Sequence, residues 1–189
     1  MIGGTIPTAL SLLTKLKLID LEENMFNGPA FLDISTLPEL ASYRVSLNSL
    51  TGTIPETFAP NDGSSLTEIW FAKNNLVGQI PESFFASNTQ LTSLIMYNNM
   101  FTGTIPSNIG LLSNLEKLQL HGNAISSTIP NDLYLATQLK ELRLDKNLIT
   151  GTISTMIGDL VNLADLRIGE NPLTGTLPAE IARLSNLGT

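Results

Sequence analysis

The sequence contains no cysteine, and its 189 residues include a single histidine. Without cysteine the chain can form neither a disulfide nor a thiolate site. No apolar run approaches the roughly 18 residues that a membrane-spanning helix needs. The first basic residue is Lys15, so no charged segment precedes an apolar stretch as it does in a secretory signal. Asparagine is abundant, yet no Asn-x-Ser/Thr glycosylation sequon occurs.

Charged residues are also scarce, at 14% of the chain, and the formal net charge is -7. Nucleic acids and anionic membranes are bound by clustered lysine and arginine, so this balance disfavours both as partners. The hydrophobic share of 42% is sufficient for a sizeable core. The composition therefore indicates a chain that folds around a hydrophobic core and has a sparsely charged surface.

A repeat of 24 residues dominates the second half of the sequence. In Leu163–Pro178 the order is L-x-x-L-x-I-x-x-N-x-L-x-G-x-L-P, and steps of 24 residues towards the N-terminus return a similar pattern, with leucine, isoleucine or another apolar residue at the apolar positions. Less regular copies precede these, with spacings of 26 and 25 residues between successive asparagines. The asparagine of each unit marks the register of seven repeats: Asn24, Asn48, Asn74, Asn99, Asn123, Asn147 and Asn171. A fixed period of this length predicts a solenoid.

The repeat also sets the expected boundaries. We predict one continuous domain over residues 1–189, with partial repeats at 1–15 and 184–189. The extra residues of the longer units are expected in Ala59–Ser65 and near Ala86–Asn88, where turn-forming residues gather. Apolar side chains at Ile2 and Ile6, and at Leu184 and Leu187, are expected to be exposed at uncapped ends and to promote association there.

Elementary stereochemistry explains the pattern. Two leucines separated by one residue point to the same side of a strand, and a single unit can bury that side only against its neighbours. Each buried leucine contributes roughly 1.5–3 kcal/mol. The asparagine lies between apolar positions, so we expect its side chain to hydrogen-bond backbone groups of its own turn and of the adjacent coil.

This pattern resembles the leucine-rich repeat, and the segment Thr102–Pro106 (TGTIP) resembles the tail of its plant-type subclass. The resemblance implies an α/β solenoid: a right-handed superhelix of about seven 24-residue repeats, with a parallel sheet on the concave face. It also implies short second strands and irregular or helical turns on the convex face. Typical members are ectodomains of receptor-like kinases, receptor-like proteins and polygalacturonase inhibitors. The cysteine-paired caps and the sequons usual in that family are missing here.

The family further implies an extracellular or cell-surface location and a protein or peptide ligand on the concave face. If the alignment holds, Trp70, Ile95 and Tyr97 lie next to one another and face outwards, because the flanking apolar residues already fill the inward positions. His121 follows Tyr97 in the same column. Exposed aromatic clusters often mark binding sites. This group is the first candidate for a recognition site.

Arg143 and Arg167 occupy equivalent positions on neighbouring coils and could together hold a carboxylate of the ligand. The alternative is that they pair with Glu141, Asp145 and Asp165 across the strands. Both readings remain open at the level of sequence. In the first interpretation the two arginines bind a ligand, and in the second they only stabilise the sheet.

An enzymatic role is not expected. His121 has no cysteine partner, and no serine or carboxylate stands at a triad spacing. The sequence has no glycine-rich phosphate loop and no metal-ligand motif, so neither a cofactor nor a metal is predicted. The repeated glycines serve a close approach of the backbone within each coil.

Two other functions compete with concave recognition. Outward residues of the second strands should form a ladder of threonine side chains, which resembles the surface of solenoidal ice-binding proteins. Alternatively, the segment is a structural spacer in a longer receptor ectodomain. The residues of the candidate ice-binding face are Thr102, Thr104, Ser126, Thr128, Thr150, Thr152, Thr174 and Thr176.

Overall fold

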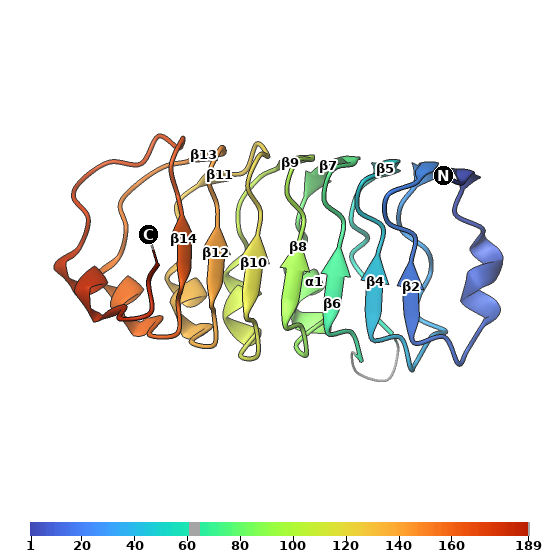
Figure 1. The fold of residues 1–189 in the computed structure, drawn as a ribbon, viewed down its shortest axis with the longest axis horizontal. Helices are drawn as coiled ribbons and strands as arrows, with labels where there is room; N and C mark the ends of the chain where they lie inside the picture. Colours follow the sequence, from blue (N-terminus) through green and yellow to red (C-terminus); the bar gives the residue numbers. More distant parts are fainter. Residues whose placement is uncertain (61–64, 189) are drawn as a thin grey trace.

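Residues 1–60 and 65–188 are described by a computed structural model, which shows a row of stacked coils (Figure 1). One strand from each of the seven repeats joins a parallel sheet in chain order, here called the concave sheet. Equivalent positions face each other, so that Leu118 lies opposite Leu94 and Leu142. The predicted parallel sheet is confirmed. Its strands are β2 (Leu18–Asp20), β4 (Ser42–Arg44), β6 (Glu68–Trp70), β8 (Ser93–Ile95), β10 (Lys117–Gln119), β12 (Glu141–Arg143) and β14 (Asp165–Arg167).

A second strand follows the asparagine in most coils, as predicted. Five of these strands form one parallel sheet, two form another, and a bridge between Gly151 and Leu173 continues the arrangement. The strands are β1 (Gly3–Thr5), β3 (Met25–Pro29), β5 (Ser49–Gly52), β7 (Asn75–Gln79), β9 (Met100–Thr102), β11 (Ser126–Ser127) and β13 (Leu148–Ile149).

The register of these second strands differs from the expectation. Val77 lies opposite Met100, and Ser126 lies opposite Leu148. In both pairs, a residue three positions after one asparagine faces a residue one position after the next asparagine. Neighbouring coils are therefore offset by two residues along this sheet. The straight ladder of threonine pairs predicted from the sequence is wrong in register, because each Thr-x-Thr segment is displaced from the next.

Short helices follow the second strands. Most begin directly after the proline of the repeat, whose fixed φ suits a helix start. The extra residue predicted near Ala86–Asn88 accompanies an α-helix, α1 (Glu82–Ser87), where other coils have 3-10 helices. The predicted insertion at Ala59–Ser65 falls largely on residues 61–64, outside the described residues, as does Thr189 of the expected last partial repeat. The 3-10 helices are η1 (Thr8–Leu12), η2 (Ser107–Leu111), η3 (Asn131–Leu135), η4 (Thr155–Asp159) and η5 (Ala179–Arg183).

The row of helices is interrupted between η1 and α1. In the described part of the first two complete coils, residues 16–60, turns take the place of a helix, and Figure 1 shows no helix there between the blue one near the N-terminus and the green α1. In the first of these coils, Ala30 and Phe31 stand where other coils have isoleucine and proline. Tyr43 is fully buried, and its hydroxyl donates to the Ala30 carbonyl over 2.7 Å.

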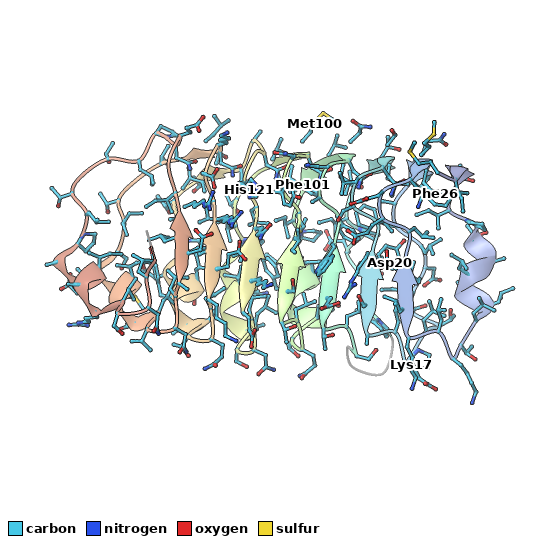
Figure 2. The ribbon with its side chains drawn as sticks, viewed as in Figure 1. Lys17, Asp20, Phe26, Met100, Phe101 and His121 are labelled. Atoms are coloured by element: carbon cyan, nitrogen blue, oxygen red, sulfur yellow. The ribbon has the colours of Figure 1, made fainter. Side chains whose placement is uncertain are left out.

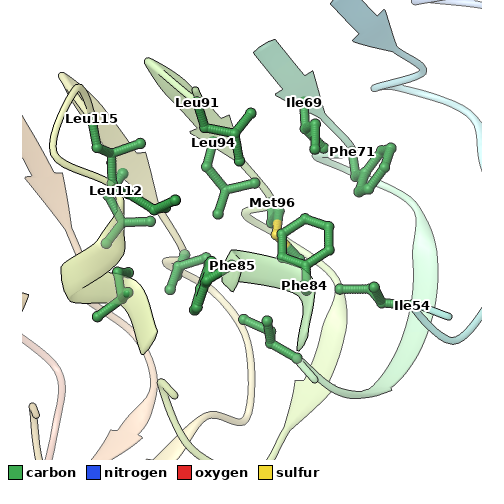
Figure 3. Close-up of a cluster of buried hydrophobic side chains, with 14 of the residues drawn as sticks. Ile54, Ile69, Phe71, Phe84, Phe85, Leu91, Leu94, Met96, Leu112 and Leu115 are labelled. Carbon is green, nitrogen blue, oxygen red and sulfur yellow. The ribbon is translucent and has the colours of Figure 1, made fainter. Parts of the chain in front are cut away.

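Apolar side chains from every coil form one core cluster. Figure 3 shows part of it, around Phe84, Phe85 and Met96. Leu94, Leu118 and Leu142 are at most 1% exposed, as their alternation predicted. The ends differ from the expectation. Ile6 and Leu184 are each 5% exposed and belong to this core, while Ile2 is exposed and Leu187 is partly buried against the core. The prediction that Ile6 and Leu184 would be exposed is therefore wrong.

The asparagine column is confirmed in its predicted role. The Asn74 side chain accepts a hydrogen bond from Leu50 N–H at 2.9 Å and donates to the Val45 carbonyl at 3.0 Å. Both partners lie in the preceding coil. The same side chain also donates to the carbonyl of Phe71 in its own turn. Each asparagine thus satisfies backbone groups that the turn after the strand leaves unpaired.

Glycine is required where two coils approach most closely. Gly151 has φ +81, and a Cβ added to it would lie 2.8 Å from the Thr128 methyl carbon of the preceding coil.

We expect Gly151→Ala to lower the free energy of unfolding by about 1–3 kcal/mol, because alanine is strained in the left-handed conformation and its Cβ would crowd Thr128. Urea denaturation of Gly151→Ala, Thr128→Ser and the double variant measures this. The double variant should recover part of the loss, since serine lacks the crowding methyl; strict additivity of the two changes would contradict the contact.

Candidate concave recognition site

Trp70 is the last residue of β6, next to the central strand β8 of the concave sheet. The Arg44 guanidinium carbon stands 4.1 Å from the centroid of its ring, and its indole N–H donates to the Ser93 hydroxyl over 3.1 Å. Glu68 holds Arg44 in place, because its carboxylate accepts from Arg44 Nε at 3.1 Å. Contacts with both neighbouring strands, β4 and β8, thus hold the Trp70 side chain in one orientation.

Ile95 and Tyr97 continue the surface towards the C-terminal coils. Ile95 is the register partner of Trp70. Tyr97 stacks on His121 with 4.4 Å between ring centroids and 8° between ring planes. The four predicted residues therefore lie together across three coils, and we call Trp70, Ile95, Tyr97 and His121 the concave patch.

The concave patch is less open than the sequence suggested. All four side chains are half-buried. Arg44 covers one side of Trp70, which reduces its exposure. The sequence reasoning missed the roles of Arg44, Glu68 and Ser93 at this site. Their positions in the columns next to Trp70 could have indicated the contact, since equivalent positions of neighbouring strands lie side by side.

Arg143 and Arg167 are neighbours, as predicted, but both are already paired. Arg143 donates to Asp165 from Nε at 3.0 Å and from its terminal nitrogen at 2.7 Å, and it contacts Glu141 at 2.6 Å. Arg167 Nε donates to the other Asp165 oxygen at 3.1 Å. Partial burial raises the pKa of Asp165, but these hydrogen bonds outweigh it and lower that pKa overall. Ion pairing within the sheet therefore occupies Arg143, while the Arg167 side chain is more exposed.

The two sides of the patch differ in charge. On the N-terminal side, the first complete coil carries three acidic residues close together in sequence: Asp20, Glu22 and Glu23. Of these, Asp20 lies 3.7 Å from a terminal nitrogen of Arg44. Burial and the neighbouring carboxylates raise the pKa of Glu22. Figure 2 shows Asp20 on the blue strand and His121 several strands further along the same face. A ligand that crosses the patch would meet an acidic surface at one side and mixed charges at the other.

His121 has a polar atom without a partner in the described part of the chain. Its Nδ1 is buried, and the same holds for Asp145 Oδ1 on the next coil. Burial lowers the pKa of His121, Asp145 opposes this, and Arg143 and Arg167 lower it further. The imidazole is therefore neutral in the folded protein at neutral pH and disfavours a proton.

The lowered pKa of His121 predicts a pH dependence of stability. In the unfolded chain the His121 imidazole takes up a proton near pH 6.5, whereas in the folded chain it does so only at lower pH. Stability should consequently fall as the pH drops below about 6.5. We expect His121→Phe, which retains a ring for Tyr97, to flatten the urea-denaturation profile between pH 7 and 5.5. An equal slope in both proteins would show that His121 does not titrate in this way.

The candidate ice-binding face is exposed but irregular. Its threonines are solvent-exposed, and Ser126 is half-buried. The Ser126 hydroxyl donates to the Gly103 carbonyl at 3.1 Å, and that of Thr174 donates to the Gly151 carbonyl at 3.3 Å. Thr128 and Thr152 lay their methyl groups against the glycines of the next coil. Much of this threonine pattern therefore has a role in joining coils.

Residues 1–60 and 65–188 are the part of the chain that the structure describes. They contain no group of three or more histidine or acidic side chains that could hold a metal ion. No helix in this part of the chain is long and apolar enough to cross a membrane.

Comparison with known proteins gives a consistent assignment. The family model described as Leucine Rich Repeat matches residues 90–112 and 114–135. Receptor-like protein 36 of Arabidopsis thaliana is 34% identical over 109 residues, which cover 58% of this chain and 15% of that protein. The plant peptide hormone receptor RGFR1, solved in complex with RGF2, superposes with a TM-score of 0.92 at 34% identity over 98% of this chain and 29% of the receptor chain.

A plant ice-binding protein is also similar in structure, with a TM-score of 0.68 and 25% identity, covering 94% of this chain and 64% of that one. The chain spans between 5% and 15% of the length of the curated relatives it matches. The repeat, the concave sheet and the asparagine column agree with these matches. The chain has the fold of a leucine-rich repeat solenoid, and it is similar in sequence to plant receptor-like proteins and in structure to the ectodomains of plant receptor kinases.

Proposed function

We propose that the chain is a non-catalytic recognition module that binds a peptide or a protein segment on its concave sheet, at the cell surface. The observation that carries the proposal is the concave patch itself. Trp70, Ile95, Tyr97 and His121 lie on adjacent coils, outside the core. The Arg44 guanidinium and the Ser93 hydroxyl hold the Trp70 ring, and the Tyr97 and His121 rings stack on each other. Fixed aromatic side chains bind with little loss of conformational entropy, and they dominate many interfaces.

The similarity to RGFR1, which was solved with the peptide RGF2, supports a peptide as the ligand class. A half-buried, partly charged sheet face suits an extended chain better than a small molecule, because it offers a row of separate contacts rather than an enclosed cavity. Arg167 contributes a cation at the C-terminal end of this row, and Arg143 supports it through Asp165.

A displayed library of random peptides tests the proposal. Peptides selected on the wild-type chain should bind the variant Trp70→Ala/Tyr97→Ala at least tenfold more weakly, since hot-spot side chains contribute about 2 kcal/mol or more each. The control is Leu111→Ala/Leu135→Ala, which truncates two exposed leucines at the ends of η2 and η3. Both variants are first shown to be folded by circular dichroism. Selected peptides that bind all three proteins equally would place recognition elsewhere.

Ice binding through the second strands is a second candidate, favoured by the similarity to the plant ice-binding protein. Ice-binding surfaces need a regular array, and the two-residue offset between coils works against one here. The test is thermal hysteresis, the gap between melting and freezing points. If the threonine face binds ice, hysteresis should survive Trp70→Ala and disappear in Thr152→Tyr. Absence of hysteresis in the wild-type protein would remove this candidate.

A further inference from the structure

A cavity of about 770 Å³ opens where the row of short helices is interrupted. Three consecutive coils line it. The first complete coil contributes Phe31, Leu32, Asp33 and Ser35. The second contributes Pro55, Thr57, Phe58, Ala59 and Pro60, and the end of α1 with the turn after it contributes Ala86, Ser87 and Thr89. Its volume lies in the range of small-molecule sites in proteins. None of these segments belongs to the concave patch.

The cavity arises from departures from the repeat rather than from the repeat itself. Phe31 occupies the position at which the second coil has Pro55, and both coils lack the helix that covers this region in later coils. A solenoid can stack without these changes, as its C-terminal coils do. Phe31 in place of the repeat's proline and the missing helices of two neighbouring coils together open the cavity. Because stacking does not require either change, they point to a role for the cavity in binding.

One wall of the cavity is aromatic. Phe31 packs edge-on against Phe58, with 5.4 Å between ring centroids, and against Phe71, with 5.2 Å. Phe58 and Phe71 are buried, whereas Phe31 remains half-buried and lines the opening. The core therefore fixes the Phe31 ring from behind, and an aromatic ligand could pack against its free side.

The other walls are polar, and their charge has one sign. Among the described residues that line the cavity, Asp33 carries the charge, and the rest are hydroxyl-bearing or apolar. The Ser35 hydroxyl and backbone N–H both donate to Asp33 Oδ1, at 2.6 and 3.0 Å. These hydrogen bonds lower the pKa of Asp33, so the carboxylate stays ionised. An anion at the rim of an aromatic pocket favours cationic ligands over anionic ones.

We infer that this cavity is a binding site for a small aromatic amine, with the ring against Phe31 and the ammonium group near Asp33. The inference does not rest on concave recognition. Phenethylamine is the probe, and phenylacetate is its matched anion of similar size. Ligand-observed NMR titration should show saturable binding of phenethylamine, and binding of phenylacetate at least tenfold weaker.

Three variants locate the site. Asp33→Asn should weaken phenethylamine binding about tenfold and remove the preference over phenylacetate, because a hydrogen bond to a charged group is lost. Ala86→Trp, at an exposed position on the rim, should block both probes by filling the opening. Ala182→Trp places the same ring on the exposed surface of the last coil and should change nothing. Trp70→Ala should also leave phenethylamine binding intact, which separates this site from the concave patch.

Several outcomes would overturn the inference. These are no binding of phenethylamine at millimolar concentration, equal affinity for the two probes, or affinity unchanged in both Asp33→Asn and Ala86→Trp. Melting curves of each variant are recorded first. Loss of binding in Asp33→Asn counts only if Ala182→Trp and the wild type, measured in parallel, retain it.

Discussion

Asn147→Ala should lower the free energy of unfolding by about 3 kcal/mol. The Asn147 side chain is 5% exposed. It accepts from Ile125 N–H at 3.0 Å and donates to the Leu120 carbonyl at 3.0 Å, both in the preceding coil. Alanine leaves two buried backbone groups without partners, and each such group costs about 1–3 kcal/mol. Urea denaturation followed by circular dichroism gives the difference.

A second substitution at the same position separates the two halves of the interaction. Asn147→Asp keeps an acceptor for Ile125 N–H but faces a carboxylate towards the carbonyls of Leu120 and Leu144. The loss should exceed that of alanine at pH 7 and diminish as the pH falls through the range in which the aspartate protonates. Asn75→Ala, at an exposed position of β7, is the control. A difference below about 0.5 kcal/mol for Asn147→Ala would mean that water replaces the lost bonds.

Phe71→Ala should cost about 3–5 kcal/mol, the usual range for removing a buried ring. Phe71 is fully buried, and its ring lies among those of Phe31, Tyr43 and Phe58 at centroid distances of 5.2, 5.7 and 5.9 Å. These rings meet edge to face and fix one another, so the surroundings cannot collapse easily into the vacated space. The measurement is again the free energy of unfolding in urea.

Phe71→Leu provides the matched comparison. Leucine occupies the equivalent position in two later coils, at Leu120 and Leu144, and it should recover a large part of the stability lost with alanine. If Phe71→Leu were as destabilising as Phe71→Ala, the geometry of the aromatic group, rather than buried volume, would hold these coils together. A loss below about 1 kcal/mol for Phe71→Ala would contradict tight packing at this site.

The regular part of the fold could be predicted because a single unit cannot bury its own leucines. The alternation at Leu118 and Leu120 fixed which side of the strand is buried, and stacking then fixed the register of the concave sheet. The asparagines followed from the same argument, since a polar side chain between buried apolar ones must find backbone partners. The adjacency of Trp70, Ile95, Tyr97 and His121 came directly from this register.

Other features depended on geometry that a repeat pattern does not contain. The second strands run obliquely, so Ser126 faces Leu148 rather than the residue 24 positions on. The register sets Arg44 opposite Trp70, but a repeat pattern does not show that its guanidinium lies over the ring. The cavity needed both the absence of helices in two coils and the position of Phe31, and neither follows from counting residues. Binding itself remains a prediction for every one of these surfaces.

The asparagine column has a mechanical consequence. Every one of its bonds runs within a coil or to the coil just before it, so no coil is tied to a distant one. Under tension applied along the row, for example in an optical trap, the coils should detach singly and in order from the weaker end. Each event would release roughly 80 Å of chain, the extended length of 24 residues at about 3.4 Å each. The recorded extension would increase in a series of steps of nearly equal length rather than in one abrupt event.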